Sequence, residues 1–125
     1  MLYQRIQAVF DDVKHYYYEM LDEYEYTEDY YQMNGEAVRY VRTVFDISRN
    51  KLANVIGTSP RTLGRFEDGV RTRLAVESIL NGIEKIAIKR LVEEEKEIEE
   101  EVAKYPVRHS SLAARFRAHR STHIA

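Results

Sequence analysis

Apolar residues recur at helical spacing in the first part of the chain. Between residues 1 and 33 they follow alternating steps of four and three positions, and this stripe comprises Leu2, Ile6, Val9, Val13, Tyr16 and Met20. Such spacing gathers apolar side chains on one face of an α-helix. We therefore expect an amphipathic helix whose apolar face is buried against the rest of the protein. The Asn34-Gly35 dipeptide favours a turn and is expected to end this segment.

The next apolar pattern also has the period of a helix, and its members are Ala37, Tyr40, Val41, Val44 and Phe45. Signals for two shorter helices follow it. Ser48 stands where the cap of the first belongs, and Gly57 stands where that helix must end with a positive φ. Thr58 or Ser59 can cap the second, and Pro60 falls at its first position, where the missing N–H costs nothing. The pattern predicts two helices joined by a tight turn.

From Thr72 onward the chain is expected to be mainly helical, with a broad apolar face formed by Leu74, Val76, Ile79, Leu80, Ile83, Ile86 and Leu91. The Asn81-Gly82 dipeptide predicts a break into a fourth and a fifth helix. Residues 91–105 then form an acidic helical extension with a narrow apolar seam at Ile98, Val102 and Tyr105. This seam fits self-pairing, pairing with the N-terminal helix, or a solvated spacer.

The formal net charge of −2 conceals four blocks of alternating sign. Residues 1–37 carry nine acidic and two basic side chains, and residues 38–90 carry five acidic and eleven basic ones. Residues 91–105 carry seven acidic and two basic side chains, whereas the tail, residues 106–125, has four arginines and no acid. A polyanion would therefore be met by the block that holds the two short helices.

Composition narrows the class of protein. The chain has 125 residues, no cysteine, two prolines and five glycines, which favours one all-α domain with extensions. Disulfides and thiolate metal sites are excluded, and we expect no metal or other cofactor. No apolar run is long enough to cross a membrane, and no signal peptide is recognisable, so we expect a cytoplasmic protein. The sequence has no catalytic Ser-His-Asp arrangement, no glycine loop that could cradle a phosphate and no cluster of metal ligands. We therefore do not expect an enzyme.

Within residues 36–90 the spacing of small, apolar and polar positions resembles the phage-repressor class of helix-turn-helix proteins, the Cro/repressor or XRE-like family. The matching residues are Leu52, Ala53, Ile56, Gly57, Ser59, Thr62, Leu63, Arg65, Phe66, Glu67 and Gly69. The resemblance implies a lambda-repressor-like helix-turn-helix domain over residues 34–90, here with an extra N-terminal helix and a long C-terminal helix. It also implies a bacterial or phage protein that binds double-stranded DNA as a homodimer.

The resemblance places the start of the second short helix in the major groove of DNA, with its early residues at base edges. The base-reading residues would be Ser59, Pro60, Arg61, Thr62 and Arg65. Arg61 and Arg65 are four positions apart and share a helix face, and each guanidinium can bridge two acceptors of guanine. Pro60 can only pack, for instance on a thymine methyl group. The alternative is that Arg61 is simply a solvated surface charge.

A second set of residues is expected at DNA phosphates, and it comprises Arg49, Asn50, Arg71 and Arg73. Arg49 and Asn50 begin a helix, whose free N–H groups and dipole favour an anion. The family also places a partly buried ion pair at the positions of Arg42 and Glu67. Gly64 departs from the small polar residue usual inside the recognition helix, at a cost of about 1 kcal/mol relative to alanine.

The function expected from these residues is sequence-specific transcriptional regulation by operator occupancy. Two alternatives remain open. The first is an antitoxin that binds a protein partner through residues 1–33 or 91–125 and uses the helix-turn-helix for autoregulation. The second is a phage-encoded inhibitor built on the same scaffold. The acidic, tyrosine-rich end of residues 1–33 fits either a structural role or a partner surface. The basic tail could lie on phosphate, dock on an acidic surface or stay disordered.

Overall fold

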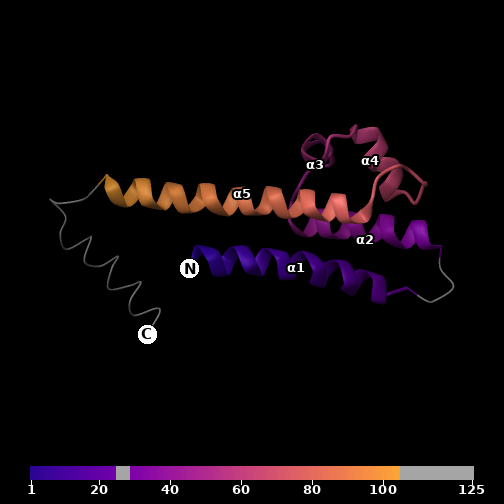
Figure 1. Cartoon of the computed structure of the whole chain (residues 1–125), viewed down its shortest axis with the longest axis horizontal. Coiled ribbons are helices and arrows are strands. Elements are labelled where there is room, and N and C mark those ends of the chain that lie inside the picture. Colours follow the sequence, from indigo (N-terminus) through magenta and orange to yellow (C-terminus); the bar gives the residue numbers. More distant parts are fainter. Residues whose placement is uncertain (25–28, 105–125) are drawn as a thin grey trace. The chain divides into compact units, whose positions relative to one another are not determined.

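The computed structural model describes residues 1–24 and 29–104 (Figure 1). The only regular secondary structure in those residues is helical, with no strand, which confirms the predicted all-α class. The five helices are α1 (Leu2–Asp22), α2 (Tyr30–Val44), α3 (Arg49–Ile56), α4 (Pro60–Glu67) and α5 (Val76–Ala103). The basic tail, residues 106–125, lies outside the described residues, and so does part of the tyrosine-rich segment, residues 25–28.

The chain divides into two units, Met1–Leu91 and Val92–Ala125. The first unit contains α1 to α4 and the first half of α5. In the second unit, α5 continues to Ala103, and of the expected seam Ile98 is 38% exposed, Val102 is half-buried and Tyr105 lies outside the described residues. Self-pairing of this seam, and its pairing with the N-terminal helix, stay predictions.

The N-terminal stripe forms the predicted amphipathic helix, and α1 and α2 lie side by side as an antiparallel pair (Figure 1). The deepest positions of α1 are Val9, Val13 and Tyr17, which are spaced by four residues and therefore face the same way. Tyr16, on the edge of this face, packs edge-on against Phe45, with ring centroids 6.2 Å apart. The N-terminal helix is therefore part of the folded body.

The predicted boundary at Asn34-Gly35 is wrong, because α2 begins at Tyr30 and passes through both residues. Asp29 caps this helix, and its carboxylate accepts hydrogen bonds from the backbone N–H groups two and three residues on, at 2.8 and 3.4 Å. Gly35 serves close packing. A Cβ added there would lie 2.3 Å from the backbone oxygen of Phe66 at the end of α4.

Asn34 is buried because its side chain joins α1 to α2. Its Nδ2 donates to the backbone oxygen of Tyr30 at 2.8 Å, and its Oδ1 accepts a hydrogen bond from the hydroxyl of Tyr17. Burial, with smaller contributions from the neighbouring Tyr30 and Tyr18, raises the pKa of Tyr17 to about 12. A hydrogen-bonded residue pair inside the apolar contact therefore fixes how the two helices are aligned.

The two short helices begin and end where the local signals place them. The Ser48 hydroxyl accepts a hydrogen bond from the N–H of Lys51 at 3.1 Å, and α3 follows. Gly57 ends α3 with a φ of 76°, a conformation that costs glycine little. Ser59 then caps α4, whose first residue is Pro60. A three-residue turn thus separates two eight-residue helices.

The break predicted at Asn81-Gly82 is also wrong, because α5 is one continuous helix from Val76 to Ala103. The glycine again marks a close approach. A Cβ at Gly82 would lie 2.4 Å from Cγ2 of Ile56 and 3.0 Å from Cδ1 of Leu52, so α3 crosses α5 at this point. A larger residue would push α3 outward.

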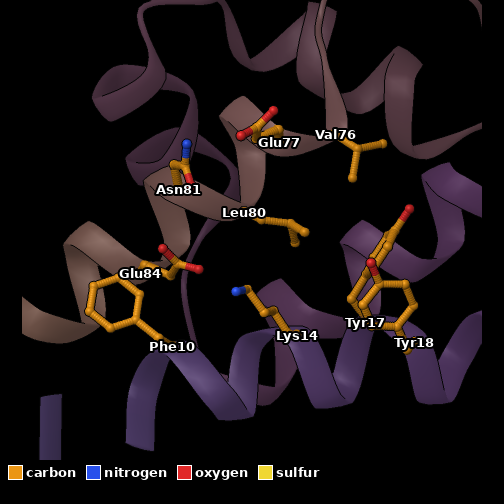
Figure 2. A pocket seen from close by; sticks show the side chains of 9 residues that line it. All are labelled: Phe10, Lys14, Tyr17, Tyr18, Val76, Glu77, Leu80, Asn81 and Glu84. Atoms are coloured by element: carbon orange, nitrogen blue, oxygen red, sulfur yellow. The ribbon is translucent and has the colours of Figure 1, made fainter. Parts of the chain in front are cut away.

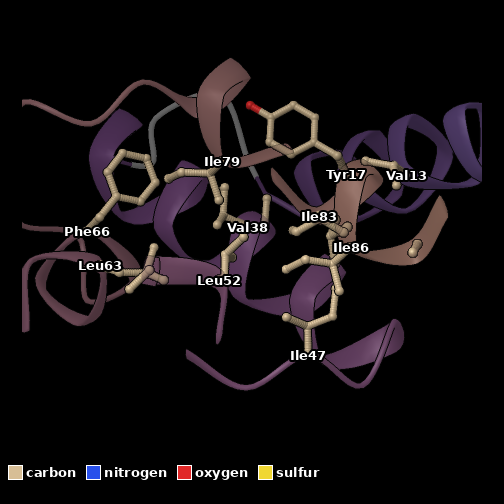
Figure 3. Packing of buried hydrophobic residues seen from close by; sticks show 14 of the residues in the cluster. Val13, Tyr17, Val38, Ile47, Leu52, Leu63, Phe66, Ile79, Ile83 and Ile86 are labelled. Carbon is tan, nitrogen blue, oxygen red and sulfur yellow. The ribbon is translucent and has the colours of Figure 1, made fainter. Parts of the chain in front are cut away.

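All five helices contribute to one apolar core within the first unit (Figure 3). Its fully buried large side chains include Val13, Val38, Val41, Leu52, Leu63, Ile79 and Ile83. Because α3 and α4 are too short to be stable alone, their apolar faces in this core hold them in place. The core therefore sets the position of the surface that α3 and α4 present to solvent.

Gly35→Ala should destabilise the protein by about 1–3 kcal/mol, because the added methyl group meets backbone atoms that cannot rotate away. Gly64→Ala is the matched control in another helix. Its Cβ would first meet Nη1 of Arg49 at 3.2 Å, a side-chain atom that needs to move by only a few tenths of an ångström. The free energy of unfolding of that variant should exceed that of the parent protein by up to about 1 kcal/mol. Urea denaturation measures both, and equal effects would contradict the close-packing role of Gly35.

Tyr17→Phe should lower stability by about 1 kcal/mol near neutral pH through loss of the hydrogen bond to Asn34. The folded pKa of Tyr17 is raised, so the stability linked to its proton is present below roughly pH 10. That stability is lost as the pH rises through about 12. The stability difference between the parent protein and Tyr17→Phe should therefore shrink over this interval. Tyr3→Phe, at an exposed tyrosine, is the control. If the stability difference between the parent protein and Tyr17→Phe does not change with pH, the raised pKa of Tyr17 is refuted.

Candidate nucleic-acid interface

The exposed face of α4 is formed by residues at its start and middle. Pro60, Arg61 and Arg65 are exposed, whereas Leu63 and Phe66 are buried against the core. No hydrogen bond or ion pair engages the guanidinium group of Arg61 or Arg65 within the described part of the chain. These two side chains are thus the positive groups that α4 offers to a ligand.

Ser59 and Thr62 have a local role at the start of α4. The hydroxyl of Ser59 accepts a hydrogen bond from the backbone N–H of Thr62 at 3.0 Å and donates to the Thr62 hydroxyl at 2.9 Å. Both side chains therefore fix the first turn of the helix, with Thr62 half-buried. Of the five residues expected at base edges, these two are engaged in capping, and Pro60 offers only apolar surface.

A buried carboxylate, Glu67, lies at the other end of α4 and is only 1% exposed. The expected ion pair with Arg42 is present. Nε of Arg42 donates to Oε2 of Glu67 at 2.7 Å, and Nη2 donates to Oε1 at 3.0 Å. This two-point geometry fixes both position and orientation. Nη1 of Arg42 also donates to the backbone oxygen of Ile47 at 3.0 Å, in the link before α3.

Two further arginines surround Glu67. Arg49, expected at phosphate, donates from Nε and Nη2 to Oε1 of Glu67 at 3.2 and 3.1 Å. Arg39 places its Nε 3.5 Å from the same oxygen and its Nη2 2.6 Å from Asp68. Burial alone would lower the pKa of Arg39, but the hydrogen bond to Asp68 and the two carboxylate charges outweigh it and raise the pKa.

Arg39 belongs to this cluster as well, although it was not predicted to do so. Arg39 precedes Arg42 by three positions, which places both on one face of α2. That spacing was a usable signal once the Arg42–Glu67 pair was expected. The contact of Arg49 with Glu67 had no comparable signal, because it depends on how α3 crosses α4.

The remaining residues expected at phosphate are Asn50, Arg71 and Arg73, and all three are exposed. Arg71 is oriented by an aromatic ring, since its Cζ lies 5.9 Å from the ring centroid of Tyr31. A cation above a ring face is attracted by the ring's quadrupole, which restricts the side chain without using its N–H donors. Arg71 therefore presents donors to solvent from a defined position.

A basic hollow of about 400 Å³ lies at the start of α3 and is lined in part by Arg42, Ser48, Lys51 and Arg90. Arg90 is held in place because its Nη1 and Nη2 donate hydrogen bonds to the backbone oxygens of Phe45 and Asp46, at 2.6 and 2.9 Å. Asp46 also lines the hollow and Arg42 is paired with Glu67, so Lys51 and Arg90 are the cations that could attract an anion such as a phosphate to this helix N-terminus. Sequence reasoning did not single out Lys51 and Arg90.

In the view of Figure 1, α3 and α4 lie on the side of the first unit away from α1. The exposed acidic residues of α1 therefore lie apart from the arginines of α4. Among the described residues there is no group of three or more histidine, cysteine, aspartate or glutamate side chains placed to hold a metal ion. None of the described helices is long and apolar enough to cross a membrane.

Comparison of the chain with protein-family models, with curated proteins and with solved structures gave no match.

Glu67→Gln should destabilise the protein by about 2–4 kcal/mol, because three guanidinium groups lose their shared carboxylate. The cost is lower than for a fully buried pair, since the side chains of Arg39 and Arg49 are 42% and 41% exposed. Asp68→Asn removes an exposed carboxylate from the same end of α4 and should cost about 0–1 kcal/mol. Urea denaturation of both variants measures the difference. Similar losses in the two variants would contradict the central role of Glu67.

Proposed function

We propose that this protein is a sequence-specific DNA-binding transcriptional regulator that acts by occupying an operator as a dimer. The observation that carries the proposal is the exposed pair Arg61 and Arg65 on α4, a helix whose other face and both ends are anchored. The resemblance of residues 36–90 to phage-repressor helix-turn-helix proteins supports the same conclusion. From that resemblance we also propose that α2 to α5 form a lambda-repressor-like domain.

The proposed division of labour follows from the contacts of each arginine. Arg61 and Arg65 have unengaged guanidinium groups, and each can donate two hydrogen bonds to O6 and N7 of a guanine in the major groove. Pro60 adds an apolar surface beside them. Ser59 and Thr62 support the readers by capping the helix. Specificity in this proposal therefore rests on two arginines.

Phosphate binding is assigned to groups around the readers. Arg71, Arg73 and Asn50 are exposed, and we add Lys51, which lines the basic hollow before α3. Phosphate contacts fix the register of a protein on the duplex and add affinity without reading sequence. Arg49 is assigned first to Glu67, and its remaining Nη1 group can still donate to a phosphate.

Dimerisation is part of the proposal because one eight-residue helix reads few base pairs. Two copies of α4 on half-sites about 34 Å apart would contact successive major grooves on one side of the duplex. The extension formed by residues 91–125 is the proposed source of the dimer contact. We place the dimer in the cytoplasm of a bacterium, or of a bacterium infected by phage.

A second candidate function, protein binding by an antitoxin or phage-encoded inhibitor, is favoured by one observation. Four tyrosines of α1 and α2 are largely exposed: Tyr3, Tyr18, Tyr30 and Tyr31. Tyrosine is enriched at protein interfaces because it combines a large apolar ring with a polar hydroxyl. In this alternative, the tyrosines bind a protein partner while α4 binds DNA for autoregulation.

Arg61→Ala should weaken binding to a duplex selected from a random library by about 1–3 kcal/mol and relax the preference at one base pair. Arg71→Ala should instead weaken binding to selected and random duplexes equally and reduce the salt slope by about one unit. Lys14→Ala, on α1, is the control for loss of one positive charge. Fluorescence anisotropy at several salt concentrations measures all three variants.

The outcomes separate the roles. Equal losses on selected and random duplexes for Arg61→Ala would remove it from the base-reading set. Absence of salt-dependent binding by the parent protein to any duplex would overturn DNA binding altogether and favour the protein-binding alternative.

A further inference from the structure

A hollow of about 480 Å³ lies between α1 and the first half of α5, within the unit Met1–Leu91 (Figure 2). Its volume is within the range of about 300–1,000 Å³ that is typical of small-molecule sites. One wall is aromatic and consists of Phe10, Tyr17 and Tyr18 from α1. The opposite wall, from α5, includes Leu80 and Glu84. The hollow thus combines an apolar wall with a charged group.

Glu84 is the unusual member of this lining. Only 9% of this residue is exposed, and it lines the hollow. No hydrogen bond or ion pair holds its carboxylate among the described residues. Burial raises its pKa, and the charge of Lys14 only partly offsets that effect. The carboxylate is not cut off from water, and a ligand in the hollow that brought its own hydrogen-bond donors would take the place of that water.

We propose that the hollow binds a small organic cation with an aromatic body, whose ammonium group donates hydrogen bonds to Glu84. A carboxylate can only accept hydrogen bonds, so the ligand must bring the donors. Phe10, Tyr17 and Tyr18 provide ring surfaces for the body of the ligand and for cation–π attraction. Glu77 also lines the hollow, but it is exposed to water, so its charge contributes less to the attraction than that of Glu84.

Lys14 does not fill the role of that cation. Its ammonium group points toward the carboxylate of Glu84 (Figure 2) and lowers the pKa of that group, but the two are not within ion-pair distance, and Lys14 is exposed to water. The two residues should therefore act in opposite directions on a cationic ligand. Glu84 attracts the ligand at short range, whereas Lys14 repels it.

Tyramine is a suitable probe because it carries one ammonium group on an aromatic body, and 4-ethylphenol is its neutral counterpart without the amine. Calorimetric titration of the full-length protein should show tyramine binding at least about tenfold tighter than 4-ethylphenol, as expected for a charged hydrogen bond. Tyramine should also shift the amide resonances of residues that line the hollow in two-dimensional NMR spectra.

Three variants test the assignment of Glu84. Glu84→Gln should weaken tyramine binding about tenfold or more. Lys14→Gln should strengthen it, because a repulsive charge is removed. Glu77→Gln, at an exposed carboxylate of the same hollow, is the matched control and should change the affinity less than about threefold. Thermal melting checks that each variant is folded.

The proposal is overturned by any of three results. These are no binding of tyramine at millimolar concentration, equal affinity for tyramine and 4-ethylphenol, or equal tyramine affinity of the parent protein and a folded Glu84→Gln. If Glu84→Gln does not fold, the comparison of the two probes on the unmodified protein decides the question. None of these measurements involves DNA, so their outcome is independent of the proposed regulatory function.

Discussion

The buried carboxylate of Glu67 connects the three helices on which the candidate interface depends. It lies at the end of α4 and accepts hydrogen bonds from Arg42 of α2 and Arg49 of α3. An isolated eight-residue helix is marginal in water, so the direction of α4 must come from its surroundings. Glu67 anchors one end, the Ser59 cap anchors the other, and the buried Leu63 fixes the face between them.

This arrangement explains how one arginine can have two roles. A guanidinium has five N–H donors in a rigid fork, and Arg49 uses only its Nε and Nη2 groups on Glu67. Its side chain is 41% exposed, and in the proposed function the Nη1 group would donate to a phosphate. A lysine there could not hold the same two-point contact, since its ammonium is a compact charge on a flexible stem.

Local signals in the sequence were sufficient for some elements and misleading for others. Ser48, Gly57 and Pro60 mark helix ends through their own backbone and side-chain chemistry, and α3 and α4 start and stop accordingly. Gly35 and Gly82 were interpreted as turn residues, yet each lies inside a helix where another helix passes closely. A glycine that permits a turn and one that permits close packing look alike locally. The grouping of Arg39 and Arg49 at Glu67 likewise follows from helix crossing.

The net charge of −2 does not argue against DNA binding once the positions of the charges are considered. The acidic residues of α1 lie away from α4 in the view of Figure 1. At physiological ionic strength, interactions between exposed charges decay over about 8 Å, so charges on the far side of the unit contribute little at α4. The local potential there is set by Arg61, Arg65 and their neighbours. In the proposed function, the acidic residues on α1 would oppose DNA binding in the wrong orientation because they repel phosphate.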